Sequence, residues 1–253
     1  MRFKILSLFC LILLASCVSK KEILYLQDIE ANGERSVNYQ SANIQPNDIL
    51  KITVESLVPE AALPYNKTSG QGMQAQNIQL MQIDGYLVSI DNAISFPVLG
   101  NISTANLTTK QLEDAIKNKL VSEGHLTNPT VNVRLINAKV TVLGEVNQPG
   151  VYTFTEQNIT LLQALGYAGD LTINGKRDDV LMTREVDGMR KVTHIDLTSS
   201  AFMDSEFYFI KPNDVIIVNQ NNPKVKKAGF VGDVGTILTI ASLALSITIL
   251  LSR

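Results

Sequence analysis

The chain has 253 residues, with 22 Lys and Arg against 24 Asp and Glu, giving a formal net charge of −2. Because a basic excess is absent from the sequence, we do not expect nucleic acid as a partner. The only cysteines, Cys10 and Cys17, lie near the N-terminus, so the rest of the sequence offers no disulfide, no thiol nucleophile and no thiolate metal site.

Residues 1–16 predict a lipoprotein signal peptide. Arg2 and Lys4 precede an apolar run, and the segment ends in Leu14-Ala15-Ser16, directly before Cys17. Small residues before a cysteine resemble the bacterial lipobox, in which the cysteine is lipidated and becomes the first residue. The resemblance implies that Cys17 carries acyl chains such as palmitate. A signal peptide cleaved at another site is the alternative.

The residues after Cys17 bear on the compartment. Val18 and Ser19 lack the aspartate that commonly holds lipoproteins in the inner membrane, and no acidic run of the kind that directs some lipoproteins to the surface follows. We therefore expect Cys17 in the inner leaflet of an outer membrane, with the body in the periplasm. Residues 17–41 are polar and weakly patterned, which indicates a tether whose residues 23–25 can pack on the body.

A first domain is expected over residues 42–138. Pro46-Asn47 predicts a turn into a strand that starts at Ile49. A near copy, Pro-Asn-Asp into a strand, recurs within 210–218, either as a reused turn or as a relic of repeated units. The Gly- and Gln-rich stretch at 68–82 indicates a loop.

The rest of this domain contains one well-marked helix. Residues 85–90 and 93–100 predict a strand pair that turns at Asp91-Asn92. Thr108 and Gln111 have the spacing of a capping box. The following helix has one apolar face, and the alternation over 130–135 predicts another strand. The apolar face of the helix comprises Leu112, Ala115, Ile116 and Leu120.

A second domain is expected over residues 139–220. Strands at 140–146 and 151–154 flank the turn Gln148-Pro149-Gly150. Thr160 and Gln163 repeat the capping-box spacing before a short helix that stops at Gly169. Asp187-Gly188 predicts a tight hairpin. Both domains are expected to be small and α+β.

Residues 234–251 form an uncharged stretch that predicts a transmembrane helix. Its 18 residues span roughly 27 Å as a helix, close to the hydrocarbon thickness of about 30 Å. A buried C-terminal helix is the alternative. The preceding linker, 221–233, is basic through Lys224, Lys226 and Lys227, whereas only Arg253 follows the helix.

This charge distribution argues against the inner membrane. A basic cluster on the periplasmic side would violate the positive-inside rule there. In an outer membrane the lysines can meet lipid phosphates, and a simple solvated linker is an equal alternative.

One stripe of the C-terminal helix is small and hydroxylated. At about 100° per residue these positions share roughly a third of the helical wheel, which suits a wet lumen or close helix contact. The pore-facing candidates are Thr236, Thr239, Ser242 and Ser246. Leu243 and Leu250 interrupt the stripe, so a lone anchor with scattered Ser and Thr is the alternative.

Catalytic patterns are absent from the sequence. His125 and His194 are its only histidines, and both are interpreted as ordinary surface or strand residues. No phosphate loop, paired metal-ligand spacing or nucleophile motif is present. We therefore expect neither an enzyme nor a cofactor.

Several segments, in order, resemble the outer-membrane polysaccharide export (Wza-like) family over roughly 40–219. They are Pro46-Asn47-Asp48, Phe96–Gly100, Leu107-Thr108, Asn128–Val133, Val142–Tyr152, Thr160–Leu165 and Pro212–Ile216. The resemblance implies a polysaccharide export domain followed by an SLBB-type β-grasp domain. The chain departs from the larger members in having one β-grasp unit.

The resemblance also implies a function. Family members form rings, often octamers, whose C-terminal helices line a pore through the outer membrane for capsular or exopolysaccharide. The implied partners are the polysaccharide, outer-membrane lipid, other copies of the chain and an inner-membrane chain-length regulator or co-polymerase. A membrane-tethered sugar-binding or adaptor module that forms no pore is the alternative.

Overall fold

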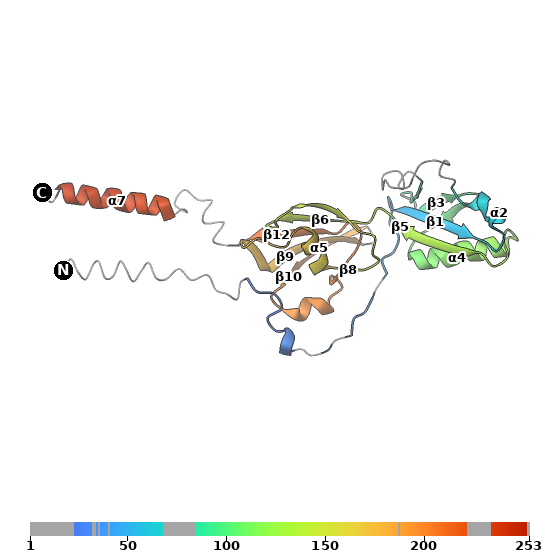
Figure 1. The fold of residues 1–253 in the computed structure, drawn as a ribbon, viewed down its shortest axis with the longest axis horizontal. Helices are drawn as coiled ribbons and strands as arrows, with labels where there is room; N and C mark the ends of the chain where they lie inside the picture. Colours follow the sequence, from blue (N-terminus) through green and yellow to red (C-terminus); the bar gives the residue numbers. More distant parts are fainter. Residues whose placement is uncertain are drawn as a thin grey trace.

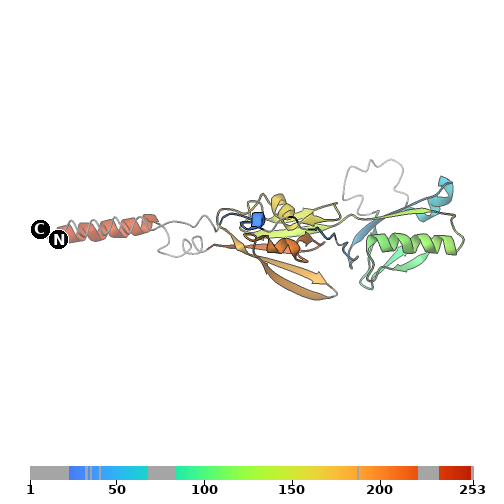
Figure 2. The same cartoon turned by 90° about the horizontal axis from the view of Figure 1, so that it is seen from below.

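The computed structural model describes residues 23–31, 34, 36–39, 41–67, 84–186, 188–221 and 234–251. Two α+β domains, each with its own hydrophobic core, lie end to end in both views (Figures 1 and 2). The α+β fold class expected for the body is therefore confirmed. The loop predicted at 68–82 lies outside the described residues.

The first domain is built on a three-stranded antiparallel sheet with the order β2-β1-β5. Its strands are β1 (Ile49–Glu55), β2 (Tyr86–Leu87) and β5 (Thr130–Leu135). Helix α4 (Thr109–Ser122) buries Leu112, Ile116 and Leu120 completely in the core that the sheet shares. Removing three such side chains from water contributes about 1.5–3 kcal/mol each.

Short elements complete this domain. Strand β1 leads into α2 (Pro59–Ala62) and the 3₁₀ turn η3 (Leu63–Tyr65), and β3 (Ala93–Phe96) forms a hairpin with β4 (Gly100–Ser103).

Two details of the predicted first domain are wrong. The segment at 85–90 does not pair with 93–100, because β2 pairs with β1 and β3 pairs with β4. The turn at Asp91-Asn92 nevertheless forms, with Asn92 at φ 54°. Ala115 is exposed rather than part of the buried helix face, since the larger side chains at its neighbours already fill the contact with the sheet.

The second domain contains a five-stranded sheet with the order β10-β9-β12-β6-β7. Only β6 and β12 are parallel neighbours. The sheet strands are β6 (Lys139–Gly144), β7 (Gly150–Thr153), β9 (Gly175–Val186), β10 (Met189–Ile195) and β12 (Val215–Gln220). Gly144 is required where β6 meets β12, because a Cβ there would lie 2.1 Å from the Val218 carbonyl oxygen.

Smaller elements pack against this sheet (Figure 1). Helix α5 (Leu161–Tyr167) follows β8 (Ile159–Thr160), and β8 pairs with β11 (Phe209–Ile210). A 3₁₀ turn, η4 (Ser200–Asp204), precedes β11, and another, η2 (Ile29–Ala31), lies in the N-terminal segment.

The local signals at helix starts and at the tight turn are confirmed. Thr108 and Thr160 each accept a hydrogen bond from the backbone N–H three residues on, and Gln111 and Gln163 complete both capping boxes. Strands β9 and β10 pair as a hairpin across a two-residue connection, with Gly188 at φ 74°. Asp187 of that connection lies outside the described residues.

Helix α7 (Val234–Leu251) occupies the uncharged C-terminal stretch. Within it, side chains are described only at 235, 238–243 and 246–247. Among the described residues there is no helix both long and apolar enough to cross a membrane. The helical conformation predicted for 234–251 is therefore confirmed, whereas its assignment as a membrane-spanning helix is without support from the described residues.

Candidate functional site

The site residues predicted at the two ends of the chain are only partly described. Cys17 and the basic residues Lys224, Lys226, Lys227 and Arg253 lie outside the described residues. On α7, Thr239 donates to the Gly235 carbonyl at 2.8 Å, and Ser246 donates to the Ser242 carbonyl at 2.8 Å. Ser242 donates in the same way to the Thr239 carbonyl. The side chain of Thr236 is not among those described.

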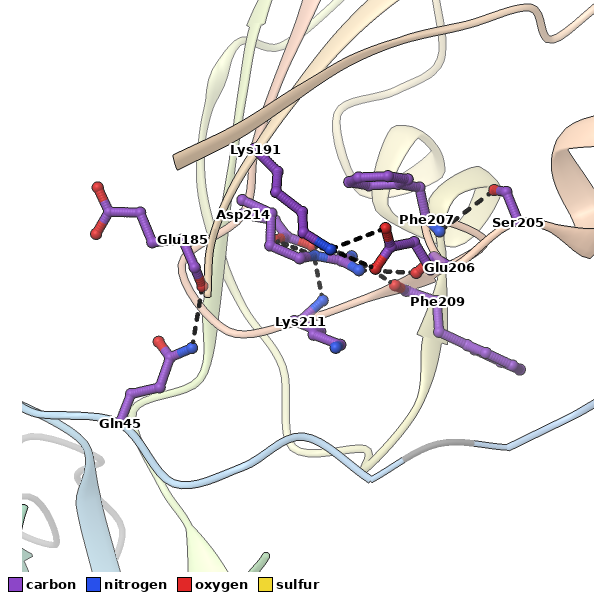
Figure 3. A network of polar contacts seen from close by, with 10 residues as sticks. Gln45, Glu185, Lys191, Ser205, Glu206, Phe207, Phe209, Lys211 and Asp214 are labelled. Carbon is purple, nitrogen blue, oxygen red and sulfur yellow. Dashed lines mark hydrogen bonds and ion pairs between the residues drawn. The ribbon is translucent and has the colours of Figure 1, made fainter. Parts of the chain in front are cut away.

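A buried ion pair lies in the second domain, and its acidic member, Asp214, is labelled in Figure 3. Arg184 of β9 and Asp214 before β12 are each 1 % exposed. Their fork is bidentate, with Nε to Oδ1 at 2.9 Å and Nη2 to Oδ2 at 2.6 Å. Nη1 of Arg184 donates to the Glu206 carbonyl and Nη2 to the Phe209 carbonyl, so each guanidinium nitrogen donates at least one hydrogen bond.

Asp214 also holds the turn that starts β12. Its Oδ2 accepts the Lys211 backbone N–H at 2.7 Å, and Asn213 adopts φ 68°. The equivalent turn before β1 is the same: Asp48 Oδ2 accepts the Gln45 backbone N–H at 2.9 Å. Both Pro-Asn-Asp segments therefore form one turn type, in which the aspartate is buried.

The two aspartates differ in their charge partners. Within the described residues Asp48 makes no ion pair, and burial raises its pKa to about 6. The hydrogen bond from Gln45 opposes that rise only in part. Asp214, in contrast, has the Arg184 guanidinium in direct contact.

A groove lies beside the ion pair. We call it the aromatic groove; it has a cavity volume of about 370 Å³ and is lined by Tyr208, Phe209, Lys211, Asn38 and Gln157, among others. The rings of Tyr208 and Phe209 meet edge to face, with their centroids 4.8 Å apart. The ring centroid of Tyr39 lies 5.3 Å from that of Phe209. Such a mixture of ring faces and hydrogen-bonding groups in a concave surface is typical of small-molecule sites.

A second groove, of about 360 Å³, lies between the two domains. We call it the interdomain groove, and its lining includes Asn132 and Arg134 of β5 and Phe154 and Glu156 after β7. Ala42 and Gln157 line both grooves, so the two adjoin. We call the two adjoining grooves, which have lining residues in both domains, the track.

A segment near the N-terminus binds the second domain. We call residues 25–28 the N-terminal strap. Tyr25 donates to Asp170 at 2.6 Å, and the backbone N–H groups of Leu26 and Gln27 donate to carbonyls at 197 and 198. Asp28 accepts from Ser199 at 2.9 Å. The expectation that residues near 23–25 pack on the body is thus confirmed for Tyr25.

The histidines lie in exposed or half-exposed pairs. His194 contacts Asp179 at 2.5 Å, and His125 contacts Glu123 at 3.3 Å. In the described part of the chain no cluster of three or more His, Cys, Asp or Glu side chains is placed to hold a metal ion.

Sequence reasoning missed Arg184, Lys211 and the grooves. A signal for Arg184 was present, because it continues the inward alternation of Val180 and Met182 along β9. An arginine at a core-facing strand position requires a buried anionic partner. The aromatic groove joins residues near 37 and 157 to residues near 208, and no local pattern indicates that meeting.

Comparison with known proteins agrees with this architecture. The polysaccharide biosynthesis/export protein family matches residues 36–136, and the SLBB domain family matches residues 138–218. The EPS I polysaccharide export outer membrane protein EpsA of Ralstonia solanacearum is 27% identical over 202 residues, which are 77% of this chain and 52% of that protein. EpsA of Ralstonia nicotianae is 28% identical over 161 residues, 62% of this chain and 41% of that protein. The chain thus spans about half the length of the curated relatives it matches.

Proposed function

Because this chain belongs to the Wza-like polysaccharide export family, we propose that it is an outer-membrane lipoprotein that forms an oligomeric channel for capsular or exopolysaccharide. One observation carries the proposal. An export domain and an SLBB domain follow each other directly, between a lipobox-like Cys17 and an uncharged C-terminal helix.

The N-terminal strap sets the orientation of the body in this proposal. Tyr25 is anchored on the SLBB domain, and the eight Cα–Cα steps from Cys17 to Tyr25 span at most about 29 Å when extended. A lipidated Cys17 therefore keeps the SLBB domain next to the membrane. Helix α7 also follows the SLBB domain in the chain, so the export domain faces the periplasm.

Helix α7 is the membrane segment in this proposal. Its full sequence has 18 residues without a charge. The hydroxyls of Thr239, Ser242 and Ser246 each donate to a carbonyl of their own helix, so these donors are satisfied within α7. In a ring, these residues and Thr236 face a hydrated lumen, and Lys224, Lys226 and Lys227 meet lipid phosphates at the periplasmic face.

The transport step itself is passive. The ring is a conduit, and the energy comes from synthesis of the polymer at the inner membrane. A chain-length regulator or co-polymerase in that membrane is the proposed partner of the export domains. The family is one of export proteins, and no catalytic step is assigned to this chain.

A second candidate function is a tethered sugar-binding adaptor, which the aromatic groove favours. In that case α7 or the lipid only anchors the chain, and no pore forms. Both candidate functions use the SLBB domain, but only the channel predicts ion conductance through a bilayer.

Planar-bilayer recordings separate the two. We expect the purified full chain to give conductance steps. A thiol reagent should reduce them in Ser246→Cys, which faces the proposed lumen. The matched variant Ile247→Cys, one position around the helix, should be unaffected. Block at both positions or at neither contradicts the lumen assignment, and absence of conductance favours the adaptor.

A further inference from the structure

Lys211 is a cation without a partner in the aromatic groove. Its side chain is half-buried, and within the described residues its ammonium makes no hydrogen bond or ion pair. In Figure 3 its only contact runs from its backbone N–H to Asp214. The neighbouring cations are satisfied, since Arg184 binds Asp214 and Lys191 binds Glu206 at 3.1 Å.

The surroundings of Lys211 leave the charge of its ammonium without a contacting anion among the described residues. Burial and the nearby charge of Arg184 lower the pKa of Lys211, because both disfavour its charged form. The Asp214 carboxylate is already shared between Arg184 and the turn, and Glu206 is held by Lys191. The carboxylates of Asp204 and Glu206 also line the groove, so an anion has to be placed at Lys211 itself, where it can complete the coordination of the ammonium without breaking the pair between Lys191 and Glu206.

The walls of the groove restrict the kind of anion. The aromatic residues Tyr208 and Phe209 line the groove, and the same groove carries side-chain amides at Asn38 and Gln157. Flat apolar faces next to hydrogen-bonding groups suit a sugar ring, which has C–H faces and a rim of hydroxyls. The volume of about 370 Å³ lies in the range of ligand pockets and exceeds what a bare small ion needs.

We propose that the aromatic groove binds an acidic sugar residue, with its carboxylate on Lys211 and its ring against Tyr208 and Phe209. The inference rests on the proposed export function and specifies its substrate class: a polysaccharide that contains uronic acids. Because the aromatic and interdomain grooves adjoin, the next sugars of the chain follow the track past Gln157.

Calorimetric titration of the purified full chain tests this. The probes are a galacturonic acid trimer, the same trimer as its methyl ester, and inorganic phosphate. We expect the free acid to bind, and the ester to bind at least about tenfold more weakly, because it lacks the charge-assisted hydrogen bond. Phosphate should not compete, since it lacks the ring that the aromatic walls contact.

Three variants locate the contact. Lys211→Met should weaken acid binding by about tenfold or more, and Lys211→Arg should retain most of it. Lys176→Met, at a lysine that pairs with Asp179 and is not part of the groove lining, is the matched control and should leave binding unchanged. Lys211→Gln gives the same comparison if Lys211→Met does not fold, as judged by thermal melting.

The outcomes are distinct. Equal binding of acid and ester, or displacement by phosphate, overturns carboxylate recognition. Absence of trimer binding overturns the groove assignment. None of these outcomes decides the channel proposal, which the planar-bilayer conductance measurement tests separately.

Discussion

The two Pro-Asn-Asp turns have the same backbone and different charge partners. Asp48 and Asp214 each accept a backbone N–H three residues earlier, and each follows an asparagine with positive φ. Asp214 meets Arg184, whereas Asp48 has no ion pair in the described part of the chain. A local motif thus specifies the turn, and the strand packed beside it decides whether the aspartate has a cationic partner.

The difference has a consequence for stability in each domain. In the SLBB domain, a bidentate pair with Arg184 holds Asp214, and each guanidinium nitrogen donates at least one hydrogen bond. In the export domain, the buried carboxylate of Asp48 is costly to ionise, so its domain is stabilised by a proton.

The largest expected effect comes from breaking the ion pair. Arg184→Met leaves Asp214 as an unpaired buried charge and should lower the free energy of unfolding of the SLBB domain by about 3–5 kcal/mol. Denaturant unfolding measures this. The double variant Arg184→Met with Asp214→Leu should recover much of the lost stability, because no charge is then buried alone.

The control is Arg190→Met. Arg190 is exposed and pairs with Glu185, so this substitution should change the free energy of unfolding by less than about 1 kcal/mol. A double variant no more stable than the single one contradicts this view of the pair.

Asp48 should give a smaller, pH-dependent effect. Its pKa is raised from 3.8 to about 6 in the folded state, so the folded protein binds more protons than the unfolded chain between those values. The stability that the proton supplies is present at low pH and is lost as pH rises through about 4 to 6. Asp48→Asn should remove this slope and raise the free energy of unfolding above pH 6, on the order of 1–3 kcal/mol.

Unfolding curves at a series of pH values test this prediction. Asp91→Asn, in an exposed turn of the same domain, is the matched control and should leave the slope intact. The same substitution at Asp214 should destabilise at pH 7, because it leaves Arg184 with a neutral partner. An unchanged slope in Asp48→Asn would show that Asp48 is not the group that titrates.

Features with local causes could be predicted from the sequence. Both capping boxes, the two turns and the Gly188 hairpin depend on residues within four positions of each other. The partner of β2 could not, because a two-residue strand carries too little pattern to select β1 over β3. The site was missed for a different reason, because its contacts join residues that are distant in the sequence. Arg184 and Asp214 are thirty positions apart, and Tyr25 and Asp170 are farther still.

The most direct test concerns the helix at the C-terminus. Ser252→Cys in intact cells is treated with a membrane-impermeant thiol reagent, with lysed cells as the reactivity control. Cys10 would leave with the signal peptide and Cys17 would be blocked by lipid, so label would report position 252 alone. The channel account predicts labelling from outside the cell. Labelling only after lysis would contradict it and leave the tethered adaptor as the function of this protein.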